Sequence, residues 1–329
     1  MKKSFSNNSK IFLAGCTGMV GSSIKRALIK KGYTNLFAPD RNELNLFDID
    51  LVKTWFIKNK PEIVIIAAAK VGGILANSNY PADFLIENLK IQSNIIQSAW
   101  ETGVRRLLFL GSSCIYPKYA KQPIKEEFLL ESFLERSNEW YAIAKITGLK
   151  LCESLRIQYG FDAISLMPTN LYGPNDNYHP DNSHVVASLI RKFIIAKTNN
   201  LPEVICWGTG TVLREFLHVD DLAEAVIFCL AEWHPSNENS PKDSQGNALN
   251  HLNVGTGKDI TIIELAELIS KIVDYKGKIL WDKTKPDGTP RKLLDVSRIN
   301  DLGWKARIDL ETGLKETIKC LSLEKLNSF

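Results

Sequence analysis

Short, almost wholly apolar runs alternate with amphipathic ones through the first half of the chain. The apolar runs are rich in Ile, Leu, Val and Phe, and they predict strands at residues 10–14, 35–38, 63–68, 107–111 and 163–167. Strands that are apolar at successive positions are buried on both faces, as in a parallel sheet. Between them, apolar residues recur at helical spacing, for example at Ile91, Ile95 and Ala99. The alternation predicts an α/β fold built on a doubly wound parallel sheet.

The pattern loosens in the second half. Residues 169–180 are rich in Gly, Pro, Asn and Asp, and we expect a loop there. We also expect loops at 283–295, which is basic and rich in turn residues, and at 233–250, which is polar and should be solvated. Thr261 and Glu264 have the spacing of a capping box and predict the start of an amphipathic helix.

Length and composition are those of an ordinary globular protein. The chain has 329 residues, of which 44% are hydrophobic and 24% charged, enough for one large α/β domain or two closely packed ones. We expect a first domain at residues 1–169 and a smaller, mixed α/β domain at 170–329, with parts of 215–255 returning to the first. A net charge of +4 is too small to indicate nucleic acid or a membrane surface as a partner.

The sequence also bears on location and metal binding. The N-terminal segment has an apolar core shorter than the roughly 7–15 residues of a signal peptide. The apolar run at 63–69 is far below the roughly 18 residues that a membrane span needs, so we expect a cytoplasmic protein. The 6 cysteines are scattered, without a Cys-x-x-Cys pair. We therefore expect reduced thiols and no metal site.

A glycine-rich turn follows the first predicted strand and opens the first predicted helix. Its members are Gly15, Cys16, Thr17, Gly18, Met19, Val20 and Gly21. Glycines permit a tight turn and close approach to a pyrophosphate, whose charge the amides of a helix N-terminus stabilise. The spacing G-x-x-G-x-x-G differs from the commoner G-x-G-x-x-G, and such a run is often only a structural turn. Its place between a strand and a helix favours a Rossmann-type dinucleotide site.

Asp40 and Arg41, at the end of the second predicted strand, bear on the choice of dinucleotide. An acidic residue there normally binds the ribose diol of NAD, whereas an arginine accepts the 2′-phosphate of NADP. Because a guanidinium binds phosphate in a bidentate manner, we predict NADP(H) as the cofactor. The alternative is that Arg41 is a solvated charge paired with Asp40 or Glu43.

Tyr141 and Lys145 stand four residues apart in a run that should be helical, so they share one face. We expect the Lys145 ammonium to lie beside the Tyr141 phenol and to lower its pKa from the usual value of about 10. The tyrosine could then donate or accept a proton. Ser112, directly after a predicted strand, is expected to hold the substrate oxygen. These residues indicate carbonyl–alcohol redox chemistry.

Several longer runs match a known family. They are AAAKVGGILAN, YPADF, FLGSSCIYPK, YAIAKITGLKLCES, MPTNLYGPNDNYHPDNSHV, REFLHVDD and KPDGTPRKLLD, spread over nearly the whole chain. On these runs the chain resembles the extended short-chain dehydrogenase/reductases, and within them the GDP-L-fucose synthases. Tyr-x-x-x-Lys is shared across the superfamily, whereas Ser-Ser-Cys-Ile-Tyr-Pro and Asn-Ser-His-Val are specific to this branch. Cys16 and Thr17 depart from the His-Arg of many bacterial members, which leaves Arg41 alone to discriminate NADPH from NADH.

The resemblance implies NADPH-dependent 3,5-epimerisation and 4-reduction of GDP-4-keto-6-deoxy-D-mannose to GDP-L-fucose. The C4 ketone acidifies the hydrogens at C3 and C5, so inversion needs a base, an acid on the opposite face and groups that polarise the ketone. Cys114 suits the base, because a positive neighbourhood lowers the pKa of a thiol, and His184 suits the acid. The implied catalytic residues are Tyr141, Lys145, Ser112, Cys114 and His184. Cys114 as an inert core thiol, and Ser113 in place of Ser112, remain alternatives.

The other implied residues bind the two ligands. Besides the glycine turn and Arg41, the coenzyme is expected to contact Leu110, Gly111, Ser112, Ser113, Lys145, Pro168, Thr169, Asn170, Leu171 and His184. The GDP-sugar is expected to contact Lys192, Trp207, Arg214 and Asp287, with Lys285 and Lys292 as further candidates for the diphosphate, ribose or base. Residues 218–221 are expected to fix the return of the chain to the first domain.

The family also implies a homodimer, formed by the helices around 88–100 and 141–159. Two other functions stay open. One is a different nucleotide-sugar epimerase, dehydratase or reductase of the superfamily. The other is a non-catalytic NADP(H)-binding sensor.

Overall fold

A parallel sheet of 6 strands forms the larger part of the molecule, in the order β2-β1-β3-β4-β5-β9. The computed structural model describes residues 6–321. The strands are β1 (Ile11–Ala14), β2 (Leu36–Phe37), β3 (Ile63–Ile66), β4 (Arg106–Leu110), β5 (Ala163–Pro168) and β9 (His251–Val254). Every residue of β1, β3, β4 and β5 is buried, as expected for strands covered on both faces.

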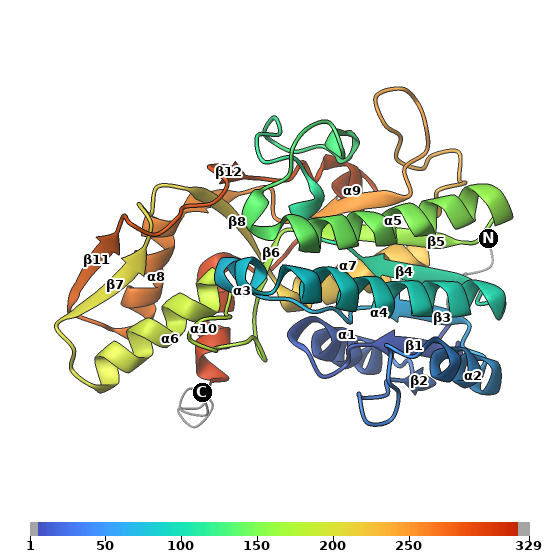
Figure 1. The fold of residues 1–329 in the computed structure, drawn as a ribbon, viewed down its shortest axis with the longest axis horizontal. Coiled ribbons are helices and arrows are strands. Elements are labelled where there is room, and N and C mark those ends of the chain that lie inside the picture. Colours follow the sequence, from blue (N-terminus) through green and yellow to red (C-terminus); the bar gives the residue numbers. More distant parts are fainter. Residues whose placement is uncertain (1–5, 322–329) are drawn as a thin grey trace.

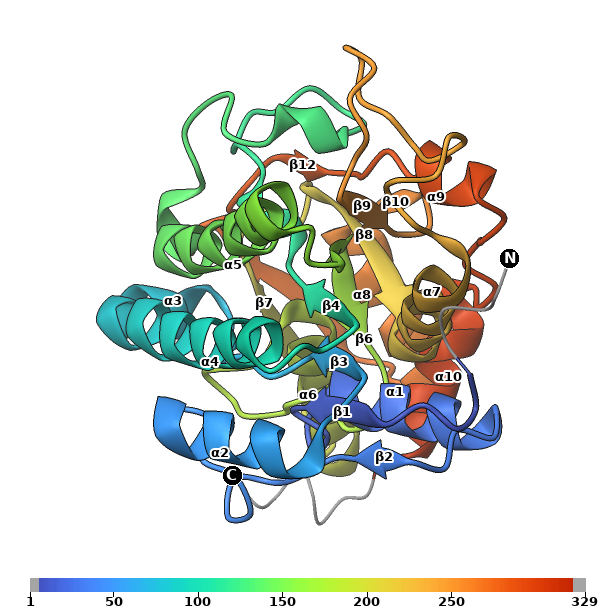
Figure 2. The ribbon, with the colours of Figure 1, turned by 90° about the vertical axis from the view of Figure 1, so that its right-hand side faces the viewer.

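Helices cover both faces of this sheet, as Figure 2 shows. On one face lie α2 (Ile49–Asn59), α4 (Pro81–Glu101) and α5 (Glu139–Tyr159), and on the other α1 (Met19–Lys30) and α7 (Val219–Glu232). The predicted doubly wound, Rossmann-type α/β fold is thereby confirmed.

A smaller, mixed part extends from this layer (Figure 1). Its central strand β8 (Leu213–His218) pairs with β6 (Asn170–Tyr172) and β12 (Arg291–Lys292) in parallel and with β10 (Asp259–Thr261) in antiparallel. A separate parallel pair joins β7 (Glu203–Trp207) to β11 (Lys278–Asp282). The helices α6 (Val185–Thr198), α8 (Ile262–Val273) and α10 (Leu310–Lys319) pack around a second core that includes Phe193, Leu265 and Leu314. The predicted smaller α/β part is confirmed, whereas the domain boundary after residue 169 stays a prediction.

Short elements complete the chain between the larger ones. They are α3 (Ile74–Asn79), α9 (Ser297–Asp301) and the 3-10 turns η1 (Ser113–Ile115), η2 (Glu126–Phe128) and η3 (Arg136–Asn138). The capping box of Thr261 and Glu264 opens α8 as predicted. Within residues 6–321, no helix has both the length and the apolar character required to cross a bilayer.

The predicted loops need correction. The segment 169–180 contains β6 and the segment 283–295 contains β12, because both short strands are created by pairing with β8 rather than by an apolar pattern of their own. The segment 233–250 is not solvated throughout. Trp233 is only 1% exposed, and its indole nitrogen donates to Ser240 Oγ at 3.1 Å.

Residues 218–221 join the two parts of the molecule. The Asp220 carboxylate accepts hydrogen bonds from Ser23 Oγ and Arg26 Nη2 on α1. The Asp221 carboxylate accepts from the backbone nitrogens of Arg307 and Ile308. These contacts agree with the expectation that this run fixes the return of the chain to the main sheet.

Candidate active site

The candidate residues gather where the parallel strands end. The glycine turn follows β1, Gly111–Ser113 follow β4, and residues 169–171 follow β5. Because β1, β4 and β5 belong to one parallel sheet, their carboxyl ends lie at the same edge. This edge is where ligands of doubly wound folds bind.

The glycine turn is shaped for close approach of backbone to ligand. Gly15 has φ +86°, and a Cβ there would lie 2.6 Å from Ala68 N. A Cβ on Gly21 would lie 2.0 Å from Gly15 O. Gly18 is the N-cap of α1, where no side chain of the described residues caps the helix and the first turn holds no acidic residue. The first-turn amides can therefore bind a pyrophosphate, so the turn fits the coenzyme.

Arg41 is the candidate for the 2′-phosphate. The carboxylate of Asp40 accepts hydrogen bonds from Asn42 N at 2.7 Å and Glu43 N at 3.1 Å, and so closes its own turn. Arg41 is exposed, and within residues 6–321 no ion pair joins it to Asp40 or Glu43. The paired alternative is not supported, and the guanidinium suits NADP(H). Cys16 Sγ donates to Ala38 O at 3.1 Å, which ties the glycine turn to this segment.

Helix α5 places Tyr141 and Lys145 on one face, next to the end of β4. Lys145 is 3% exposed, and its Nζ donates to Leu110 O at 2.9 Å and lies 5.8 Å from the centroid of the Tyr141 ring. A hydrogen bond joins the side chains of Ser112 and Tyr141. Ser113 is 2% exposed, so Ser112 rather than Ser113 faces the tyrosine.

The predicted lowering of the Tyr141 pKa is wrong for this site. Burial raises the pKa of Tyr141 well above its ordinary value, the charge of Cys114 raises it further, and the bond to Ser112 offsets only part. Lys145 does not offset it because its ammonium binds a backbone carbonyl instead of the phenol. Burial lowers the pKa of Lys145 itself to about 7. Tyr141 is therefore held as a protonated phenol, which suits a proton donor.

Cys114 lies in η1, directly beyond the serines, and is half-buried. Its sulfur accepts hydrogen bonds from Asn138 Nδ2 at 3.2 Å and Lys292 Nζ at 3.6 Å. The sulfur thus has polar partners and does not lie in a purely apolar core, while its catalytic role stays a prediction. Asn138 is absent from the residues expected from the sequence. Lys292 was a candidate for the diphosphate, ribose or base, and here its ammonium contacts the sulfur.

His184 is the N-cap of α6 and faces the same region. The loop before it packs on the backbone that follows β3, where Gly73 N donates to Asn182 O at 3.2 Å. Although His184 is exposed, the surrounding protein atoms lower its pKa, and the charge of Lys292 lowers it further. Lys292 thus interacts with both Cys114 and His184.

The residues expected to bind the GDP-sugar form two contacting pairs. Lys192 Nζ lies 5.6 Å from the centroid of the Trp207 ring, and the Arg214 guanidinium donates to Asp287 O at 3.2 Å. Trp207 is 48% exposed, and Lys285 Nζ lies 5.3 Å from the same ring. A half-exposed indole between two ammonium groups suits a planar aromatic group that carries phosphates.

Some expected ligand contacts are instead engaged within the fold. The Asp287 carboxylate accepts from Thr209 N at 2.7 Å and Thr209 Oγ1 at 3.0 Å. The side chains of Thr169 and Asn170 donate to Glu215 O at 3.2 and 2.8 Å. Contacts of these residues with ligands stay predictions. Across residues 6–321, no cluster of three or more His, Cys, Asp or Glu side chains could hold a metal ion.

Known proteins are similar to this chain in both sequence and fold. GDP-L-fucose synthase 1 of Arabidopsis thaliana is 55% identical over 94% of this chain and 92% of its own. GDP-L-fucose synthase of Escherichia coli K12 is 54% identical over 94% of this chain and 96% of its own. The GDP-mannoheptose C4 reductase of Campylobacter jejuni, solved with NADP bound, superposes with a TM-score of 0.85 at 36% identity, covering 96% of this chain and 99% of that one.

These likenesses confirm the resemblance on which the sequence analysis relied. Residues 11–243 also match the family described as the NAD dependent epimerase/dehydratase family. That match covers the whole glycine turn and every expected catalytic residue. The chain belongs to the NAD dependent epimerase/dehydratase family.

Proposed function

We propose that this chain converts GDP-4-keto-6-deoxy-D-mannose to GDP-L-fucose, by 3,5-epimerisation followed by NADPH-dependent 4-reduction. The observation that carries the proposal is the position of Cys114. This half-buried thiol lies next to Ser112 and Tyr141 and accepts a hydrogen bond from Lys292. The charge of the same Lys292 ammonium lowers the pKa of His184. A simple carbonyl reductase needs no such acid–base pair. The relatives from Arabidopsis thaliana and Escherichia coli, both above 50% identity and both named GDP-L-fucose synthase, support the same assignment.

The coenzyme site is built from the sheet edge. The amides after Gly18 would hold the pyrophosphate and Arg41 the 2′-phosphate, with Lys145 and the residues after β4 and β5 beside the nicotinamide half. When bound, NADPH supplies the hydride that reduces C4.

The protein side chains handle the protons. Ser112 and Tyr141 donate hydrogen bonds to the C4 oxygen, which stabilises the enolate. Cys114 removes the proton from C3 or C5, and His184 delivers one to the opposite face. In the last step Tyr141, held protonated by burial, gives its proton to the C4 oxygen.

Other enzymes of the superfamily fit less well. A dehydratase would be expected to carry acidic residues after the catalytic serine, where this chain has Ser113 and Cys114. A 4-epimerase would need neither Cys114 nor His184. A sensor without catalysis would not need the complete set of Ser112, Tyr141 and Lys145.

The decisive experiment supplies GDP-4-keto-6-deoxy-D-mannose and NADPH. We expect oxidation of the coenzyme and a product that co-elutes with GDP-fucose and not with GDP-rhamnose. Tyr141→Phe should abolish reduction and leave coenzyme binding intact. In deuterated water, Cys114→Ala should no longer exchange label into C3 and C5. Folded protein that oxidises no NADPH with this substrate overturns the assignment.

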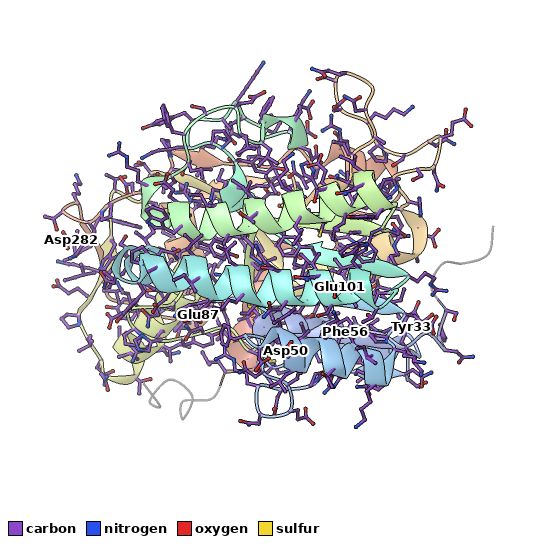
Figure 3. The ribbon with its side chains drawn as sticks, turned by 45° about the vertical axis from the view of Figure 1, so that its right-hand side comes forward. Tyr33, Asp50, Phe56, Glu87, Glu101 and Asp282 are labelled. Carbon is purple, nitrogen blue, oxygen red and sulfur yellow. The ribbon has the colours of Figure 1, made fainter. Side chains whose placement is uncertain are left out.

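We also propose a homodimer. Helices α4 and α5 run side by side (Figure 3, where Glu87 and Glu101 lie along α4). They expose large apolar side chains, with Ile86 50% and Ile157 79% exposed. Covering such side chains is a common reason for self-association. Light scattering should give twice the chain mass for wild type and the single mass for Ile157→Lys.

A cytoplasmic location is the further proposal. All of the cysteines are free, which suits a reducing compartment. Fractionation of the source cells, with antibody detection of the chain, tests this location.

A further inference from the structure

The sulfur of Cys114 lies among hydrogen-bond donors. Asn138 Nδ2 is 3.2 Å away and Lys292 Nζ 3.6 Å away. A thiolate is a far better acceptor than a neutral thiol, so an amide and an ammonium both directed at one sulfur favour its charged form.

The fold fixes Lys292 at this place. In the parallel pairing of β12 with β8, Lys292 is the register partner of Arg214, so the two cationic side chains lie on the same face of adjacent strands. Arg291, the preceding residue, points to the other face, where it forms an ion pair with Asp259 at 2.6 Å. Two residues after Lys292, Leu294 N donates to the buried Glu215 carboxylate at 2.9 Å, which anchors the strand.

The charged and titratable groups around the sulfur come from several elements. Tyr141 faces it from α5, Arg214 from β8 and Lys292 from β12. Tyr141 is held neutral by burial, whereas Arg214 and Lys292 are cations. The Asp287 and Glu135 carboxylates also act on Arg214, whereas the charged group in direct contact with the sulfur is the Lys292 ammonium.

We propose that Lys292, assisted by Asn138, positions the Cys114 sulfur and stabilises the negative charge on it when it acts as the base of the epimerisation. This inference rests on the proposed function. In each inversion the C–H bond at C3 or C5 breaks, an S–H bond forms, and the electron pair moves into the enolate that ends on the C4 oxygen. The enolate carbon then takes a proton from His184 on the opposite face, which restores the C4 carbonyl and completes the inversion. Before the second inversion the thiol releases its proton to solvent and His184 takes one up, so solvent deuterium enters both carbons through His184. Lys292 and Asn138 are positioning residues, because they act through the sulfur.

The direct test needs no substrate. The rate at which iodoacetamide alkylates Cys114, followed by mass spectrometry of its peptide across pH, reports the thiolate fraction. Lys292→Met should slow alkylation at pH 7 about tenfold or more, since it removes the ammonium that stabilises the charged sulfur, and should leave the high-pH plateau unchanged. Lys292→Arg should restore most of the rate. Arg291→Met, the neighbour on the opposite face, should alkylate as wild type does.

Asn138→Ala gives an independent reading if Lys292→Met folds poorly. It should slow alkylation severalfold at pH 7, since it removes the amide donor and keeps the ammonium. If both Lys292→Met and Asn138→Ala alkylate with the wild-type pH midpoint, the proposal is wrong.

Deuterium exchange separates this role from binding of the diphosphate. We expect Lys292→Met to lower the maximal rate of exchange at C3 and C5 about tenfold at saturating GDP-sugar. A raised KM with unchanged maximal exchange and unchanged alkylation would overturn the inference and assign Lys292 to the diphosphate. Because alkylation is measured on the protein alone, a failure of the proposed function would leave its outcome intact.

Discussion

Glu215 offers the sharpest test of how the fold supports the site. This residue of β8 is 0% exposed, and its carboxylate accepts hydrogen bonds from the backbone of two other segments. Oε1 accepts from Thr256 N at 2.6 Å and Gly257 N at 2.7 Å, and Oε2 accepts from Leu294 N at 2.9 Å. Burial raises the pKa of Glu215, and the backbone donors offset only part of that effect. One carboxylate thus joins β8, the turn after β9 and β12.

Glu215→Gln keeps the shape and removes one acceptor. The amide oxygen of the glutamine can accept hydrogen bonds from the backbone donors on one side of the carboxylate site. On the other side the NH₂ group faces a backbone N–H, so neither donor has an acceptor. A hydrogen bond to a charged acceptor contributes about 1.5–3 kcal/mol, and an unsatisfied buried donor costs about 1–3 kcal/mol. Relief from burying a charge offsets part of this loss. We therefore expect the free energy of unfolding to fall by about 2–3 kcal/mol.

Urea unfolding followed by tryptophan fluorescence at neutral pH measures this loss. The matched control is Glu224→Gln, which removes only an exposed ion pair with Lys31 and should cost below about 1 kcal/mol. Because Leu294 anchors the strand that carries Lys292, Glu215→Gln should also slow deuterium exchange at C3 and C5 more than it weakens NADPH binding. A loss of stability below about 0.5 kcal/mol, or equal losses of exchange and coenzyme binding, refutes this account.

Three further predictions follow from the coenzyme turn and from one buried histidine. Arg41→Ala should raise the KM for NADPH about tenfold or more, because it removes a charge-assisted contact with the 2′-phosphate, and should change the KM for NADH little. Equal changes for the two coenzymes would show that Arg41 does not bind the 2′-phosphate. Gly21→Ala, whose Cβ would meet Gly15 O at 2.0 Å, should destabilise the fold by about 1–3 kcal/mol despite the better helix propensity of Ala. Gly18→Ala, with 3.7 Å to the same atom, should keep stability and weaken only coenzyme binding, as titration of protein fluorescence with NADPH can show. Burial lowers the pKa of His251 to about 4, so the unfolded chain takes up the proton first as the pH falls from 6.5. The free energy of unfolding, measured with urea, should therefore fall by about 3 kcal/mol between about pH 6.5 and 4. The same fall in His251→Gln would contradict this assignment.

The sequence specifies the large sheet well because its strands are defined by their own residues. All of Ile63–Ile66 is apolar and fully buried, so composition alone indicates a central strand. The strands β6 and β12 are different, because they carry polar residues and exist only where the backbone of β8 offers hydrogen bonds. No local pattern reports a partner that lies far along the chain.

The residues of the site also fall into two groups, those that local spacing predicts and those that it does not. Tyr141 and Lys145 are recognisable because one helix face sets their relation. The contact of Asn138 with Cys114 joins η3 to η1 across 24 positions, and that of Lys292 with Cys114 spans 178. The run that matches the family begins at Tyr141, three residues after Asn138, so it gave no signal for Asn138. The error over the Tyr141 pKa has the same origin, since burial depends on the whole fold and spacing does not report it.

The charges of this site explain why one tyrosine can serve two steps in order. A thiolate at Cys114 raises the pKa of Tyr141, so the state in which the base is ready is also the state in which the phenol keeps its proton. During epimerisation Tyr141 can therefore donate a hydrogen bond to the enolate oxygen without losing its proton to it. Once hydride has reached C4 the oxygen becomes an alkoxide, a far stronger base than an enolate, and full proton transfer from the phenol becomes favourable. Cys114→Asp keeps a negative charge near the phenol, so Tyr141 should stay protonated in this variant. Cys114→Lys places a positive charge there, so the Tyr141 phenol should ionise at lower pH. Ultraviolet difference titration of the two variants, each compared with its Tyr141→Phe counterpart, should show the lower phenol pKa only in Cys114→Lys.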